Sequence, residues 1–122
     1  MLIESATLCL ALNIYHEARG ESLEGQKAVA AVTLNRSKRK SERICHEVFK
    51  PFQFSWTIEW VITSPIVDIK AFAKAKWVAE QSLKATQDNT GGATHYHAIN
   101  VYPKWASKLV YVGQIGQHHF YR

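Results

Sequence analysis

The sequence contains no apolar run that approaches the about 18 residues of a membrane-spanning helix, so we expect no membrane insertion. It also lacks internal repeats, low-complexity segments and linkers, and a chain of 122 residues therefore predicts one domain, residues 1–122. There is no glycine-rich phosphate loop, and no serine or cysteine lies in a nucleophile signature. These absences disfavour phosphate-loop chemistry and serine or cysteine nucleophiles.

Cysteine is scarce, with only Cys9 and Cys45. The N-terminus lacks a basic segment and a small-residue cleavage site, and it carries Glu4, so we predict no signal peptide. We therefore expect two free, buried thiols in a protein made in the cytoplasm, with a disulfide as the alternative. If the protein works outside a cell, something else must release it, or the chain is a trimmed domain.

Acidic residues are fewer than basic ones, ten against fifteen, which gives a net charge of +5. This balance suits a polyanionic partner, which could be nucleic acid, an anionic lipid surface or a negatively charged cell wall. Part of the excess is concentrated in a basic cluster, which is either a binding patch or a solvated helix end. The basic cluster consists of Arg36, Lys38, Arg39, Lys40 and Arg43.

Hydrophobic periodicity predicts an α+β fold that is mainly helical, with a small antiparallel sheet late in the chain. Ser5 is a possible N-cap, and Ser64-Pro65 is a typical helix start. For the last helix we predict a buried stripe of Ile66, Ile69, Ala73, Trp77 and residues 79–83. The predicted helices are 3–18, 23–38, 41–49 and 64–86, and the predicted strands are 93–99, 109–112 and 118–121, with 113–116 between the last two.

Two carboxylates, an imidazole and a guanidinium fall between His16 and Glu21, where Gly20 must end the first helix. Apolar helices lie on both sides of this stretch. A carboxyl group held between them loses water, and its pKa should rise, which produces a general acid for neutral pH. The alternative is an ordinary helix end whose charges are solvated.

The histidines raise the question of zinc. A helical zinc-protease site needs a second histidine four residues after the first, but Gly20 follows His16 and Lys50 follows His46 at that spacing. His95 and His97 share one face of a predicted strand, a geometry that zinc can use. A third ligand would have to come from His16, His118 or His119. We expect no metal and no other cofactor.

Six motifs, in order, resemble those of the SleB/CwlJ-type cell-wall hydrolases, the peptidoglycan-cleaving domains of spore cortex-lytic enzymes that are also found in phage lysins. The first motif is N-I-Y-H-E-A-R-G-E-S-x-E-G-Q-x-A-V-A-A-V-x-L-N-R, from Asn13 to Arg36. The others are I-C-H-E-V, Q-F-S-W, G-G-A-T-H-Y, P-K-W-A and I-G-x-H-x-F-Y-R at the C-terminus. The resemblance covers about residue 8 to Arg122.

The resemblance implies a lysozyme-like domain in which the small sheet lines a glycan groove and Glu17 is the catalytic acid. It implies a lytic transglycosylase that cleaves the bond between N-acetylmuramic acid and N-acetylglucosamine and leaves 1,6-anhydro-muramic ends. A hydrolytic muramidase and a zinc-dependent N-acetylmuramoyl-L-alanine amidase are the alternatives. A non-catalytic polyanion-binding module that uses the basic cluster is a third. The absence of a signal peptide and a wall-binding domain fits a phage lysin that reaches the wall after release.

The expected partner is peptidoglycan, with no nucleic acid, and the expected state is a monomer. Glu21 either positions a substrate hydroxyl or holds the corner between two helices as a structural ion pair. The aromatic side chains of residues 52–56 form either part of the core or one wall of a groove. The remaining predicted substrate contacts are Gln53, Ser55 and Trp56 on this first wall, and Thr94, His95 and Tyr96 on the opposite wall.

Overall fold

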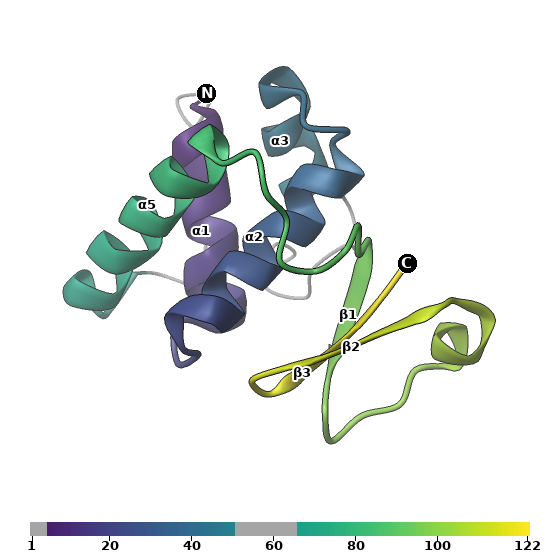
Figure 1. Cartoon of the computed structure of the whole chain (residues 1–122). Coiled ribbons are helices and arrows are strands. Elements are labelled where there is room, and N and C mark those ends of the chain that lie inside the picture. Colours follow the sequence, from purple (N-terminus) through teal and green to yellow (C-terminus); the bar gives the residue numbers. More distant parts are fainter. Residues whose placement is uncertain (1–4, 51–65) are drawn as a thin grey trace.

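The computed structural model describes residues 5–50 and 66–122. Within these ranges, a group of helices packs beside a small sheet formed by the C-terminal part of the chain (Figure 1). This arrangement confirms the predicted α+β class. The elements are α1 (Ala6–Ala18), α2 (Leu23–Arg36), α3 (Ser41–Val48), α5 (Ile69–Lys84), β1 (His95–Ala98), the 3₁₀ helix η1 (Lys104–Lys108), β2 (Tyr111–Ile115) and β3 (His118–Tyr121).

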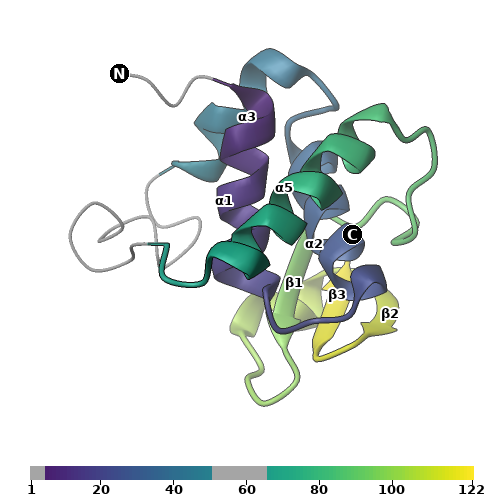
Figure 2. The ribbon, with the colours of Figure 1, turned by 90° about the vertical axis from the view of Figure 1, so that its left-hand side faces the viewer.

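The centre of the helical layer is α1, which contacts α2, α3 and α5 (Figure 2). Its residues 9–15 are all buried. The run 28–34 of α2, which is apolar except for Thr33, is buried as well, and the structure explains why it is apolar all round. Ala30 and Leu34 join the core formed with α1, whereas Ala28 and Val32 pack beneath the sheet, so α2 lies between the two layers.

The sheet is antiparallel, with the order β1-β3-β2. Tyr96 pairs with Phe120, and His97 pairs with His119. Phe120 is fully buried against α2. Because side chains alternate along a strand, Tyr96 and Phe120 face the helices, and the two histidines face away from them. The two faces of the sheet therefore have different surroundings.

Serine side chains begin two of the helices. The Ser5 hydroxyl accepts a hydrogen bond from the Leu8 amide at 3.3 Å, which confirms the predicted cap of α1. The Ser22 hydroxyl caps α2 in the same way, so the corner at residues 20–22 is also confirmed. None of the helices in the described ranges is long and apolar enough to cross a membrane.

The prediction for the last helix was wrong in two respects. Ser64-Pro65 lies outside the described residues, but α5 begins only at Ile69. Its N-cap is Asp68, whose carboxylate accepts a hydrogen bond of 3.0 Å from the Ala71 amide. Of the predicted stripe, Ile69 is 79% exposed and Trp77 is 48% exposed. The buried residues of α5 are Ala75, Val78, Ala79 and Ser82. Burial was therefore predicted correctly for Ala79 and Ser82, whereas Ala75 and Val78 were missed.

The expectation of free thiols was also wrong, because Cys9 and Cys45 form a disulfide. Cys9 lies early in α1 and is fully buried, and Cys45 lies in the middle of α3 and is half-buried. The packing of α3 on α1 brings their Cα atoms to 5.2 Å, within the range that a disulfide spans. No part of the local sequence reports this distance between helices.

The predicted strand 109–112 was partly wrong, because β2 begins at Tyr111 and continues through Gly113 to Ile115. The pairing of β2 with β3 contains an irregularity between Tyr111 and Gly113, which absorbs the extra residue. Only Gly116 then remains at the tight turn of the hairpin, where its φ of +58° favours glycine.

Candidate active site

Glu17 lies in the last turn of α1 and is half-buried where the helices meet the sheet. Its Oε1 accepts a hydrogen bond of 2.7 Å from the hydroxyl of Tyr96 on β1. One helical turn earlier, buried Asn13 accepts a hydrogen bond of 2.7 Å from the Thr33 hydroxyl of α2. The helix that carries Glu17 is therefore bonded to α2 through Asn13, and Glu17 itself is bonded to β1 through Tyr96.

The Tyr96 hydroxyl is held in its protonated form. Burial raises its pKa well above the ordinary value, and the negative charge of Glu17 and the hydrogen bond to it raise the pKa further. The Arg36 charge and the Asn13 side chain only partly oppose this rise. Tyr96 is consequently a neutral donor at neutral pH, and it orients the Glu17 carboxyl group without competing for its proton.

Glu21 connects the corner between α1 and α2 to the sheet. Its Oε1 accepts a hydrogen bond of 2.9 Å from the Gln117 amide, in the turn between β2 and β3. A side chain at Gly116 or Gly25 would collide with Glu21, so both glycines leave room for this carboxylate. This geometry favours the structural role that the sequence left open for Glu21.

His118 lies between these two carboxylate contacts. Its ring meets the Tyr96 ring edge-on at 5.1 Å, and its Nδ1 is 4.0 Å from Glu21 Oε1. Burial lowers the pKa of the imidazole, the Glu21 charge raises it, and His97 lowers it further, with a net lowering. At neutral pH His118 is therefore an uncharged packing partner that supports the Tyr96 ring.

Of the two other predicted contacts, Thr94 immediately precedes β1 and His95 is its first residue. The Thr94 carbonyl accepts a hydrogen bond of 3.0 Å from Arg36, and the Thr94 hydroxyl is 3.0 Å from His95 Nδ1. The His95 ring packs on Trp105 with its centroid at 5.0 Å, on the opposite face of the strand from Tyr96. Burial and the Arg36 charge lower the pKa of His95. Gln53, Ser55 and Trp56 lie outside the described residues.

Arg36 is a member of the basic cluster, but it has a structural position. Its Nε lies 3.2 Å from Glu47 Oε2, and it also holds the Thr94 carbonyl, so it joins α2 to α3 and to the start of β1. Lys38 and Arg39 follow it in exposed, left-handed conformations. The exposed part of the basic cluster is therefore limited to Lys38, Arg39, Lys40 and Arg43.

Sequence reasoning named Glu17 and Tyr96 but missed Asn13, Arg36 and His118 as the residues that support them. A signal for Asn13 was present, since a polar residue four positions before Glu17 shares its helix face. Arg36 and His118 gave no such signal, because their roles depend on contacts between segments far apart in the chain. Arg36 contacts Thr94 across 58 residues.

The zinc geometry can be examined at His97. Its Nδ1 is 2.8 Å from the Ala98 carbonyl, and its Nε2 is 2.9 Å from the Tyr121 hydroxyl. Both ring nitrogens therefore have protein partners. In the described part of the chain, no three His, Cys, Asp or Glu side chains come together as metal ligands would.

The site thus consists of a half-buried carboxyl group between a helix end and a sheet, oriented by a neutral tyrosine, an arrangement compatible with enzymes that use a carboxylic acid as the proton donor. The chain belongs to the cell wall hydrolase family, whose model matches residues 20–121. The catalytic domain of the germination-specific lytic transglycosylase SleB from Bacillus anthracis has 28% identity and a TM-score of 0.76, with 96% of this chain and 93% of that chain covered.

The catalytic domain of the Bacillus cereus SleB protein is similar, with 29% identity, a TM-score of 0.72, and 96% of this chain and 90% of that chain covered. These likenesses confirm the predicted lysozyme-like, mainly helical fold. The spore cortex-lytic enzyme of Halalkalibacterium halodurans is 31% identical over 114 residues, which cover 91% of this chain and 33% of the relative. The chain thus spans about a third of the length of this curated relative.

Proposed function

We propose that this chain cleaves the bond between N-acetylmuramic acid and N-acetylglucosamine in peptidoglycan as a lytic transglycosylase, with Glu17 as its catalytic acid. The observation that carries the proposal is the 2.7 Å hydrogen bond from Tyr96 to Glu17 Oε1. This bond orients the Glu17 carboxyl group, which in the proposal carries the proton for the substrate. The family and the likeness to a lytic transglycosylase support this function.

In the proposed reaction, Glu17 first donates its proton to the glycosidic oxygen, and the bond to the muramic C1 breaks. The resulting carboxylate then takes the proton of the muramic C6 hydroxyl, whose oxygen closes the 1,6-anhydro ring on C1. The acid is regenerated, and no water is consumed. The C6 hydroxyl needs no separate activation, since the substrate itself holds it at a high effective concentration.

Hydrolysis would normally require a second carboxylate to activate water or attack the sugar. Glu21 is engaged with the hairpin amide of Gln117. Burial raises the pKa of Asp88, but hydrogen bonds from Thr90, Asn35 and Gly92 outweigh this effect and lower it, so Asp88 is an ionised turn residue. The engagement of both carboxylates with the protein supports transglycosylation rather than hydrolysis.

The product tests the proposed reaction. We expect digestion of purified peptidoglycan in ¹⁸O-labelled water to give unlabelled 1,6-anhydro-muramic ends, one water lighter than the hydrolysed fragments. Mass spectrometry of the released muropeptides measures both properties. Label in a new reducing end would instead assign the chain to the hydrolytic muramidases, and a second catalytic carboxylate would then be required.

Chelation tests the metal-free mechanism against the zinc amidase. We expect lysis of purified cell walls to continue at the same rate in EDTA, because both ring nitrogens of His97 already have protein partners. The decrease in turbidity of a wall suspension measures this rate, and a known zinc amidase is the positive control for chelation. Inactivation by EDTA with recovery on adding zinc would make the amidase the leading function.

A further inference from the structure

The sheet face that points away from the helices carries a second aromatic site. The rings of His97 and Tyr121 stack at 5.3 Å, and Trp105 packs edge-on against both. A cavity of about 320 Å³ opens beside these rings. We call it the far-face pocket, and it is lined by His97, Ile99, Asn100, Val101, Tyr102, Tyr111, His119 and Tyr121.

The outer walls of the far-face pocket are more exposed than aromatic residues usually are. Tyr102 is 71% exposed and Tyr111 is 52% exposed, with Ile99 and Val101 beside them at 44% and 54%. Exposed apolar side chains that gather around a hollow mark a binding surface more often than isolated ones do. Nothing in the mechanism proposed for Glu17 uses these residues.

The chemistry of the lining identifies the kind of ligand. None of the eight lining residues is Asp, Glu, Lys or Arg, so the pocket offers no carboxylate, ammonium or guanidinium group to a charged ligand. It offers aromatic rings with polar atoms at their edges, such as the Tyr111 hydroxyl, which lies 2.8 Å from His119 Nδ1. A sugar ring has the complementary form, with an apolar face of C–H groups and a rim of hydroxyls.

We propose that the far-face pocket binds one uncharged N-acetylhexosamine ring of a wall glycan, outside the catalytic site. The inference rests on the proposed function in that peptidoglycan is taken as the substrate. The volume lies at the lower end for small-molecule sites, which suits a single ring. The charged peptide stems of the wall fit less well, because the lining contains no carboxylate, ammonium or guanidinium group to pair with them.

The position of the far-face pocket suggests how glycan binding there would assist cleavage at Glu17. Tyr96 and His97 are neighbours on β1 and point to opposite faces, so the pocket lies on the opposite face of the sheet from the Glu17 site. A wall presents many parallel glycan strands. Holding one strand on the far face raises the effective concentration of the next strand at the catalytic site.

Binding of chitotetraose, a neutral oligomer of N-acetylglucosamine without peptide, tests the proposal in the full chain that carries Glu17→Gln. We expect the oligomer to shift backbone NMR signals at Ile99, Tyr102 and Tyr111. We also expect Tyr102→Ala to weaken binding at these positions about fivefold, the scale of one lost aromatic contact. Tyr102→Phe, which keeps the ring, should retain most of the affinity.

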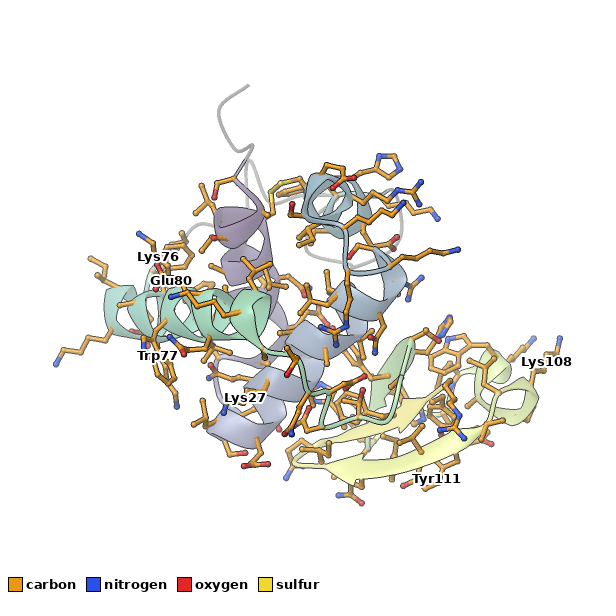
Figure 3. The ribbon with its side chains drawn as sticks, turned by 45° about the horizontal axis from the view of Figure 1, so that its top comes forward. Lys27, Lys76, Trp77, Glu80, Lys108 and Tyr111 are labelled. Carbon is orange, nitrogen blue, oxygen red and sulfur yellow. A yellow bond between two sulfur atoms is a disulfide. The ribbon has the colours of Figure 1, made fainter. Side chains whose placement is uncertain are left out.

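Trp77→Ala is the matched control, because Trp77 is another exposed aromatic residue, and it lies on α5 far from Tyr111 in the view of Figure 3. Shifts confined to the surroundings of Glu17 and Tyr96, or equal affinity of Tyr102→Ala and its parent, would overturn the proposal. The proposal would also be overturned if Tyr102→Ala changed only the molecular mass of the protein in solution, as measured by light scattering. In that case the pocket would be occupied by a second copy of the chain. Far-face binding without anhydro products would contradict the proposed mechanism instead and leave the pocket intact.

Discussion

Replacing Glu17 with glutamine is expected to reduce wall lysis by about 10²–10⁴-fold, the usual contribution of a general acid. Glutamine keeps the shape of the side chain, and its amide oxygen can still accept the hydrogen bond from Tyr96. Only the ionisable proton is lost. The initial decrease in turbidity of purified peptidoglycan measures the rate, and circular dichroism checks that the variant is folded.

Glu80→Gln provides the matched control for this experiment. Glu80 is exposed on α5 (Figure 3), so the same change of glutamate to glutamine is made without touching the site. Lysis by this control should match that of the parent. A folded Glu17→Gln variant that lyses walls at the parent rate would show that Glu17 is not the acid, and the mechanism proposed here would fail.

The local parts of the fold could be predicted because their signals lie within a few residues. Ser5 caps α1 from three positions away, and the run 28–34 identifies a helix covered on both sides. For the candidate site, the sequence predicted individual residues but not the contacts between them. Glu17 and Tyr96 were both named, yet the hydrogen bond between them joins residues 79 positions apart, and no periodicity encodes such a pairing.

The last helix shows why a correct period can still select the wrong face. Ile69, Ala73 and Trp77 follow helical spacing, and so do Ala75 and Val78, which the prediction omitted. The second set is buried because α5 packs closely on α1, and small side chains permit that approach. Hydrophobic size favoured the first set, whereas the close contact between the helices required the second.

The cysteines show a different limit. The thiols were assigned from the predicted absence of a signal peptide, which is an argument about compartment rather than about structure. Whether a disulfide can form depends on the distance between α1 and α3, and that distance results from packing around Ile44 and Val48 of α3. The sequence contains these residues but gives no measure of the separation.

Loss of the disulfide between Cys9 and Cys45 is expected to lower the free energy of unfolding by about 4 kcal/mol, the loop-closure value for a loop of this size. The bond joins residues separated by 36 positions and ties α3 to α1, the helix that carries Glu17. Urea unfolding with and without dithiothreitol measures the difference.

The double variant Cys9→Ala and Cys45→Ala is the control, because its stability should not respond to dithiothreitol. Two free thiols titrated in the denatured, unreduced protein would contradict the disulfide directly. Equal unfolding midpoints with and without reductant would show that the bond adds no stability. In the expected case, the reduced protein unfolds at lower urea and loses lytic activity over the same range, because unfolding separates Glu17 on α1 from Tyr96 on β1.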